Sequence, residues 1–155
     1  MISDKGLMLD TNVFNRVADG IVDIAVFTSH QLVATHVQKD ELQNTLSTNR
    51  KNALLEKFHT IDPAMLSTES AAWDVSAWDE CKWSSDDLCE KIFRSLKERD
   101  KGRRQDANYW RDALIAETAL KNELTLITED RDLRDVTREN GGSALCLAEF
   151  TRAVV

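Results

Sequence analysis

The sequence is poor in residues that break or cross-link a chain, with one proline, five glycines and three cysteines among 155 residues. Cys81, Cys89 and Cys146 leave an odd thiol and match no zinc-ligand spacing. We therefore expect reduced structural thiols. No apolar run is long enough to span a membrane, and the N-terminus carries no signal-peptide pattern. These absences predict one cytoplasmic domain over residues 1–155, long enough for a single hydrophobic core.

An excess of positive charge is also lacking. The chain has 27 acidic and 20 basic residues and a formal net charge of −7. The distribution of charge matters more than its sum. The segment LKERDKGRR either contacts phosphate groups, whose neutralisation dominates nucleic-acid affinity, or forms a solvated helix end and loop. It carries five basic residues: Lys97, Arg99, Lys101, Arg103 and Arg104.

Short apolar runs alternate with helical patterns along the chain. The runs LML, QLVATHV, LTLIT and ALCL are typical of buried strands. Helical patterns are predicted at 11–20, 21–30, 84–100, 105–123 and 132–140, and two adjacent glycines end the last of them. This order predicts an α/β fold, a three-layer α/β/α sandwich around a central, mainly parallel sheet.

Two stretches are less regular. Residues 37–58 mix polar and apolar positions, and we expect five side chains there to point inward: Leu42, Leu46, Leu54, Leu55 and Phe58. The segment 64–83 holds Trp73, Trp78 and Trp83. These tryptophans either anchor the segment to the core, form a surface for a protein partner, or stack on unpaired bases.

Four acidic residues are candidates for one shared site. Asp10 directly follows the run LML and Asp130 lies three residues past LTLI. In open parallel sheets, ligands bind beyond the carboxyl ends of the strands, where both acids are expected. A capping role at the start of the next helix is the alternative for Asp10.

Asp112 lies within a predicted helix, in DALIAETA, where aspartate is a poor helix former. The residues one turn on are apolar and small, so we expect its carboxylate to face inward, where it needs a partner or a metal. Asn108, one turn earlier, shares this face and could reach the water shell of a metal. Asp106 is the neighbouring acid, and we expect it to cap the helix.

Glu41 is the fourth candidate, because the helix that carries it begins near the same sheet edge. Asp132 is a spare candidate beside Asp130. Gathering four carboxylates is unfavourable without a cation among them. Oxygen ligands suit Mg²⁺ or Mn²⁺, and such an ion activates water and polarises phosphoryl oxygens. The pattern predicts metal-dependent phosphodiester hydrolysis.

Four segments together resemble the PIN-domain family, specifically the VapC-type ribonucleases of toxin–antitoxin pairs. These are LMLDTNVF, HVQKDEL, DALIAETA and LITEDRDL, which occur in this order along nearly the whole chain. The family's acidic residues correspond to Asp10, Glu41, Asp112 and Asp130. Family positions that support the acids by hydrogen bonding correspond to Thr11, Asn12 and Thr128. The segment 64–105 matches no pattern of the family.

The resemblance implies a Mg²⁺- or Mn²⁺-dependent endoribonuclease that cleaves single-stranded RNA, forms a homodimer and is inhibited by a cognate antitoxin. Two other functions stay open. The same fold could be a non-catalytic module that binds nucleic acid or protein. A phosphatase-like hydrolase is a third option, but the segment LDTN lacks the second aspartate two residues after Asp10 that such enzymes use.

Overall fold

A computed structural model describes residues 2–68 and 87–154 of the chain. Its five-stranded sheet has the order β3-β2-β1-β4-β5, and every neighbouring pair is parallel. The strands are β1 (Leu7–Leu9), β2 (Leu32–Ala34), β3 (Ala64–Met65), β4 (Thr125–Ile127) and β5 (Ser143–Leu145).

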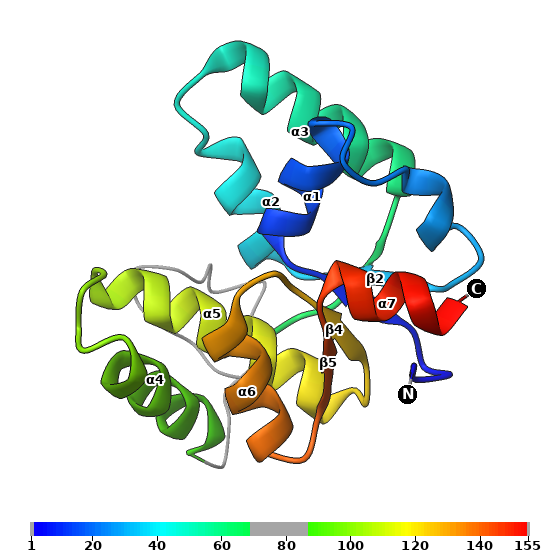
Figure 1. Ribbon diagram of the computed structural model, residues 1–155. Helices are drawn as coiled ribbons and strands as arrows, with labels where there is room; N and C mark the ends of the chain where they lie inside the picture. Colours follow the sequence, from blue (N-terminus) through cyan, green and yellow to red (C-terminus); the bar gives the residue numbers. More distant parts are fainter. Residues whose placement is uncertain (1, 69–86, 155) are drawn as a thin grey trace.

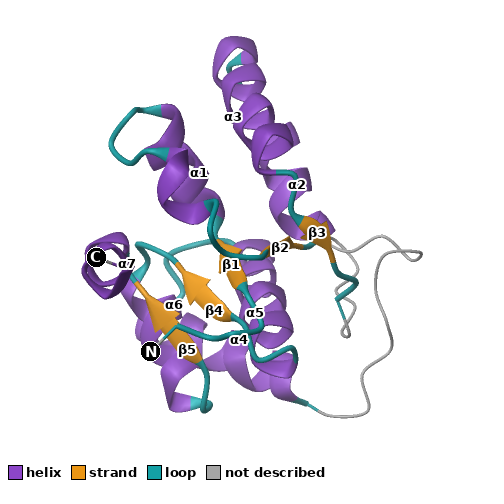
Figure 2. Ribbon diagram, turned by 90° about the vertical axis from the view of Figure 1, so that its right-hand side faces the viewer, coloured by secondary structure: helices purple, strands orange, loops and turns teal. Residues whose placement is uncertain are grey.

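Helices cover both faces of this sheet (Figures 1 and 2). Helices α1, α2 and α3 lie together on one side, and α4, α5 and α6 lie together on the other. The predicted three-layer α/β/α sandwich is confirmed. The helix bounds are α1 (Thr11–Ala18), η1 (a 3₁₀ helix, Ile24–Phe27), α2 (His36–Gln43), α3 (Thr48–Ile61), α4 (Leu88–Arg99), α5 (Asp106–Lys121), α6 (Arg131–Glu139) and α7 (Leu147–Val154).

The alternation of side chains along the strands divides the core into two layers. Met8 and Leu126 belong to the cluster that includes buried residues of α4, α5 and α6. Leu7, Leu9 and Ile127 belong to the cluster with buried residues of α1, α3 and α7. Burial of each large apolar side chain contributes about 1.5–3 kcal/mol. The strands are apolar on both faces, as a parallel sheet between two helical layers requires.

Glycine is needed at two places that set the sheet. Gly6, directly before β1, has a φ of +126°, and a Cβ there would lie 2.7 Å from the carbonyl oxygen of Gln31. Gly142, directly before β5, passes so close to Leu120 and Thr137 that a Cβ would lie 2.5 Å from the Leu120 side chain. The predicted double-glycine stop after α6 is therefore also a packing requirement.

The stretch 37–58 corrects one expectation. Leu42, Leu54 and Phe58 are buried and Leu55 is partly buried, but Leu46 is fully exposed. The reason is that the chain leaves the helical path between α2 and α3, and Leu46 lies in this connection. The inward position predicted for Leu46 is wrong.

Several element boundaries also differ from expectation. The predicted strand 31–37 ends at Ala34, because Thr35 already caps α2. The short strand β3 and the last helix, α7, had no counterpart in the sequence patterns. Only four residues of the predicted helix 21–30 are helical, as η1.

Other expectations concern features outside the sheet. Cys89 is buried, and Cys146 is a partly buried free thiol. Trp73, Trp78 and Trp83 lie outside the described residues. In the part of the chain that the structure describes, no helix has both the length and the apolar character needed to cross a bilayer.

Candidate metal and phosphodiester site

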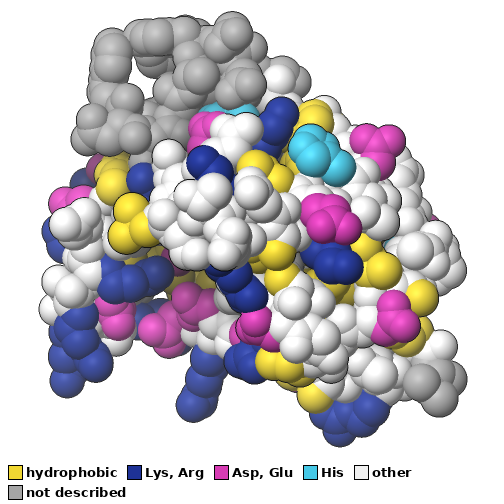
Figure 3. All heavy atoms as spheres, turned by 90° about the horizontal axis from the view of Figure 1, so that it is seen from above, with side chains coloured by type: hydrophobic (Ala, Val, Ile, Leu, Met, Phe, Trp, Pro, Cys, Tyr) yellow, Lys and Arg dark blue, Asp and Glu magenta, His cyan; other side chains and the backbone are white. Residues whose placement is uncertain are grey.

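The candidate site lies where β1 and β4 end. Asp10 follows β1 directly and caps the N-terminus of α1, so the capping role expected as an alternative is confirmed. Asp130 follows β4 after two residues and caps the N-terminus of α6. The two carboxylates therefore meet at the carboxyl edge of the sheet, where ligands bind in open parallel folds. On the face seen in Figure 3, acidic side chains gather in a hollow, and Lys and Arg side chains project around it.

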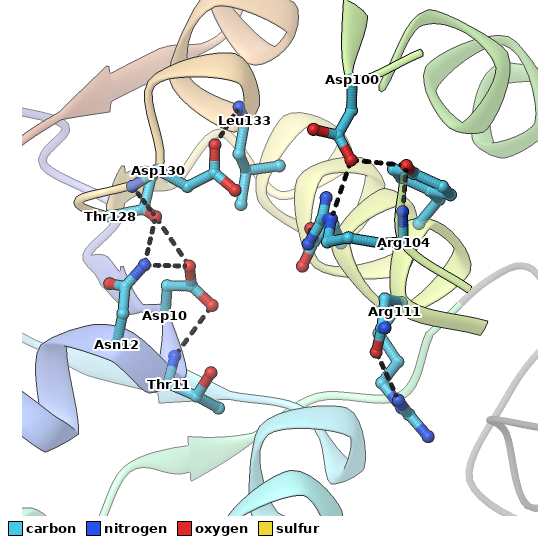
Figure 4. Close-up of polar contacts among 12 residues, drawn as sticks. Asp10, Thr11, Asn12, Asp100, Arg104, Arg111, Thr128, Asp130 and Leu133 are labelled. Carbon is cyan, nitrogen blue, oxygen red and sulfur yellow. Dashed lines mark hydrogen bonds and ion pairs between the residues drawn. The ribbon is translucent and has the colours of Figure 1, made fainter. Parts of the chain in front are cut away.

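Asp10 is held by hydrogen bonds to both of its carboxylate oxygens (Figure 4). The backbone N–H of Thr11 donates to Oδ1 at 2.8 Å. The hydroxyl of Thr128 donates to Oδ2 at 2.6 Å, and the Asn12 amide donates to the same oxygen at 3.0 Å. The Asp10 carboxylate is buried, with 5% of the residue exposed. The supporting positions that the sequence resemblance implied thus make direct contacts with Asp10.

Thr128 also links Asp10 to Asp130. The Thr128 hydroxyl oxygen accepts from the Asp130 N–H and from the Asn12 amide, both at 3.1 Å. Asn12 in turn accepts from the N–H of Glu129 at 3.2 Å. The residues after β1 and those after β4 are therefore joined into one hydrogen-bonded unit.

Helix α2 is tied to the same edge by a buried glutamine. Thr35 and Gln38 form a capping box, in which the Thr35 N–H donates to the Gln38 side chain at 2.8 Å. The Gln38 amide also donates to the carbonyl of Leu9, the last residue of β1, at 3.4 Å. This contact fixes the first turn of α2 beside Asp10. Glu41, one turn after Gln38, comes within electrostatic range of Asp10.

Asp112 approaches from helix α5. Ile115, Ala116 and Ala119 are buried, and the Asp112 side chain is only 14% exposed, so the inward orientation predicted for it is confirmed. Arg104, in the loop before α5, places Nη1 3.0 Å from Asp112 Oδ2. This guanidinium opposes the charge of Asp112, and no other group in residues 2–68 and 87–154 donates to the buried Oδ2. Asp112 thus offers a buried carboxylate oxygen whose charge is met by one guanidinium group.

The buried carboxylates disfavour each other's ionisation. Burial raises the pKa of Asp10, and the charge of Asp130 raises it further, although hydrogen bonds from Thr128 and Thr11 lower it. Burial raises the pKa of Asp112 well above its ordinary value, the charges of Asp10 and Asp130 add to this, and Arg104 opposes it. A cation among these groups would relieve both desolvation and repulsion.

Glu41 is exposed as a residue, but its carboxyl group faces the acidic side of the site. Partial desolvation raises the pKa of Glu41, and the charge of Asp10 raises it further. A hydrogen bond with Thr11 and the charges of Arg111 and Arg104 lower it. Glu41 therefore lies at the rim of the site, open to solvent and within range of the Asp10 charge.

The donor set fits a hard divalent cation, but the ligands are not drawn together around one point. Within residues 2–68 and 87–154, no three His, Cys, Asp or Glu side chains are close enough to hold a metal ion. The fit rests on the all-oxygen donors, on the buried Oδ2 of Asp112, which is met by the Arg104 guanidinium, and on the raised pKa values of Asp10 and Asp112.

The remaining candidates lie around this centre. Asn108 Oδ1 accepts a hydrogen bond from Arg111 at 3.0 Å. Asp132 lies in the first turn of α6, and its charge acts on Arg99 of α4. Asp106 is the first residue of α5 and does not cap it, because Gln105 occupies the cap position, and Asp106 pairs with Lys97 at 3.0 Å.

Sequence reasoning missed three contributors to the site. Gln38 positions α2, and the pattern Thr35-x-x-Gln38 is a readable capping-box signal. Arg104 was visible only as one of several basic residues, and its pairing with Asp112 had no sequence signal. The same holds for Tyr109, whose hydroxyl donates to Asp100 at 2.5 Å and accepts from the N–H of Arg104 at 2.9 Å.

Comparisons with known proteins give only distant similarities. No protein-family model and no curated protein matches the chain. Two crystal structures resemble it along most of their length. FitAcB from Neisseria gonorrhoeae has 18% identity and a TM-score of 0.44, covering 90% of this chain and 96% of its own. VapBC-5 from Mycobacterium tuberculosis, a member of the VapBC family of toxin–antitoxin systems, has 19% identity and a TM-score of 0.42, covering 91% and 97%.

Proposed function

We propose that this chain is a metal-dependent endoribonuclease of the PIN type, which hydrolyses phosphodiester bonds of single-stranded RNA with Mg²⁺ or Mn²⁺. One observation carries the proposal: the buried Asp112 carboxylate is matched by the Arg104 guanidinium at 3.0 Å, while the charges of Asp10 and Asp130 oppose its ionisation. A divalent ion is the simplest group that satisfies this arrangement. The four sequence segments that resemble the PIN-domain family support it.

The residues divide the work between metal binding and orientation. Asp10 and Asp112 would hold the principal ion directly, and Glu41 and Asp130 would bind it through water or help a second ion. A bound ion would supply hydroxide for in-line attack and offset charge on the phosphoryl oxygens. The hydrogen bonds from Thr11, Asn12 and Thr128 keep the Asp10 carboxylate oriented before the ion arrives.

The biological role that we propose is that of a cytoplasmic toxin with a cognate antitoxin, acting as a homodimer. This part rests on the sequence resemblance. A short neighbouring reading frame that encodes a DNA-binding protein would supply the candidate antitoxin. Co-purification of the two chains with loss of cleavage supports the toxin role, whereas unchanged cleavage in their mixture rejects that partner. Light scattering of the purified chain tests the homodimer.

The activity is tested with a labelled single-stranded RNA in Mn²⁺ and in EDTA. We expect cleavage in Mn²⁺ only, and loss of cleavage in Asp10→Asn. Asp106→Asn is the matched control, because Asp106 is an exposed acid at the start of α5 paired with Lys97. Cleavage that persists in EDTA, or that survives in Asp10→Asn, contradicts the proposal.

A non-catalytic PIN-like binding module is the second candidate. It is favoured by the ion pair between Arg104 and Asp112 and by the absence of three gathered ligands among the described residues. In that case the acids bind metal weakly, and RNA binds without being cut. The two functions differ in one assay: the module retains intact RNA in Mn²⁺, and the nuclease degrades it.

A further inference from the structure

Two basic residues at the end of α4 form ion pairs away from the four candidate carboxylates. Lys97 pairs with Asp106, and Arg99 pairs with Glu139 and Asp135 on α6. Arg104 is different, because its guanidinium contacts Asp112 of the candidate site. Only part of the basic segment LKERDKGRR is therefore oriented for the chemistry of the site.

Arg104 is held in place by its surroundings. Its N–H donates to the hydroxyl of Tyr109 at 2.9 Å, and its guanidinium lies 4.7 Å from the centre of the Tyr109 ring. Its Nε lies 3.5 Å from Asp100 Oδ2, which also accepts from the Tyr109 hydroxyl (Figure 4). Tyr109 is fully buried. Arg104 is thus supported from behind by a rigid aromatic residue and an acid.

Arg111 belongs to the same end of α5. Its Nη1 donates to Asn108 at 3.0 Å, one turn earlier on the helix, and its charge acts on Glu41 across the site. The side chain of Arg104 remains 37% exposed. On the α5 side, Arg104 therefore borders Asp112 and Arg111 lies within electrostatic range of Glu41, with part of the Arg104 surface left for a ligand.

Charge balance suggests what these arginines do. The four candidate carboxylates carry more negative charge than Arg104 and Arg111 offset, and Asp100 adds another beside Arg104, so a divalent ion would be attracted to the site. An ion bound by Asp112 would also replace the charge compensation that Arg104 provides there. The planar guanidinium group would then be available for an anion, and it matches phosphate oxygens in a bidentate geometry.

We propose that Arg104 and Arg111 form the phosphate-binding rim of the site, and that Arg104 exchanges its ion pair with Asp112 for a phosphate of the bound strand. This inference rests on the proposed nuclease function and names the residues that position its substrate. Both arginines act on phosphate, so they strengthen binding of any single strand and contribute no base preference.

The test uses the Asp112→Asn variant of the full chain, which lacks the carboxylate that Arg104 pairs with and is not expected to cleave. Binding of a fluorescein-labelled, mixed-sequence 20-nucleotide RNA is followed by anisotropy in EDTA over a series of NaCl concentrations. Adding Arg104→Ala or Arg111→Ala should weaken binding and reduce the slope of log K against log [NaCl] by about 0.7 each.

Arg94→Ala is the matched control in the same background. Arg94 is an exposed arginine on α4 that pairs with Glu90, so the substitution removes an equal charge away from the site. Its salt slope should stay at the parent value. If Arg104→Ala does not fold, Arg104→Gln takes its place, because it keeps most of the side chain without its charge. It should show the same reduced salt slope.

The outcomes separate this inference from the proposed function, because the binding assay needs neither metal nor cleavage. Unchanged salt slopes in the Arg104 and Arg111 variants would overturn the proposal that these arginines bind phosphate, and so would a parent variant that binds no RNA. Either result counts even if the wild-type chain cleaves RNA in Mn²⁺. Reduced slopes support the rim, even if the wild-type chain cleaves nothing.

Discussion

The two sides of the carboxylate site are built differently. On the sheet side, Asp10 has both oxygens engaged by Thr11, Asn12 and Thr128, which join the ends of β1 and β4. On the α5 side, Asp112 Oδ2 lies 3.0 Å from the guanidinium group of Arg104, in the preceding loop. The first carboxylate is fixed by neutral donors, and the second is balanced by a charge.

This difference suggests that the hydrogen bonds on the sheet side hold Asp10 permanently, whereas the ion pair on the α5 side can be exchanged for another partner. Directed hydrogen bonds from buried groups hold a carboxylate whether or not a cation is present. An ion pair is more easily replaced, because a competing cation or anion supplies the same charge. We therefore expect substitutions of the groups that support Asp10 to act mainly through stability, and substitutions of Asp112 and its charged neighbours mainly through ligand binding and activity.

The largest expected effect is on the α5 side. Asp112→Asn should lower the cleavage rate in Mn²⁺ about a thousandfold or more, about 4 kcal/mol in the activation barrier, because the substitution removes an anionic ligand. Single-turnover cleavage of labelled RNA measures this change. Far-ultraviolet circular dichroism should be unchanged, and full activity in this variant would remove Asp112 from the mechanism.

The sheet side should respond through stability. Thr128→Val removes the hydroxyl that donates to Asp10 and accepts from Asn12 and Asp130. Buried groups that lose a partner cost about 1–3 kcal/mol, so the melting temperature in EDTA should fall by several degrees.

Thr118→Val is the matched control for this change. Thr118 is a buried threonine whose hydroxyl donates only within α5, to the carbonyl of Leu114 at 2.8 Å. Thr118→Val should lower the melting temperature less than Thr128→Val does. An equal fall in melting temperature in both variants would show that the link between Asp10 and Asp130 adds no stability beyond that of an ordinary buried hydroxyl.

The pH dependence of the free energy of unfolding should show whether Asp112 is ionised or neutral in the folded protein. Because burial raises the pKa of Asp112, the folded metal-free protein binds this proton more tightly than the unfolded chain does. The resulting stability is present below the ordinary carboxyl pKa of 3.8 and is lost as pH rises through the raised folded-state pKa.

Asp112→Asn isolates this contribution. In EDTA, the variant should gain stability relative to the wild type as pH rises through the same window, because asparagine cannot ionise. Urea unfolding at a series of pH values gives the difference. A constant difference between the two proteins at every pH would mean that Asp112 does not change its protonation on folding.

The smallest expected effect tests the support behind Arg104. Tyr109→Phe removes the hydroxyl that contacts Asp100 and the N–H of Arg104, but it keeps the buried ring. A loss of about 1 kcal/mol, roughly fivefold in RNA affinity, is expected from anisotropy. Phe93→Leu, a change of the ring that packs against Tyr109, leaves these hydrogen bonds in place and is the control. Equal affinity in Tyr109→Phe and wild type would assign Tyr109 to packing alone.

Much of the fold could be predicted from the sequence, because apolar runs and helical periods follow local rules. Asp10 and Asp130 could be placed at the sheet edge since each follows a strand. Asp112 was recognisable as a poor helix former among buried neighbours. The local sequence is therefore enough to place these three aspartates.

Other features depend on packing between distant segments. Leu46 fits a helical pattern, yet the chain turns between α2 and α3 and exposes it. Arg104 is one of five basic residues in its stretch, and only the fold brings it to Asp112. The first turn of α2 is held by Gln38, whose amide reaches the last residue of β1, 29 positions away. Such long-range contacts leave no periodic signal.

The most direct measurement is anomalous scattering from crystals of the full chain grown with Mn²⁺. We predict a manganese peak that both Asp10 and Asp112 ligate, with Arg104 moved away from Asp112. A protein saturated with Mn²⁺ that shows no peak between these two carboxylates would contradict the account.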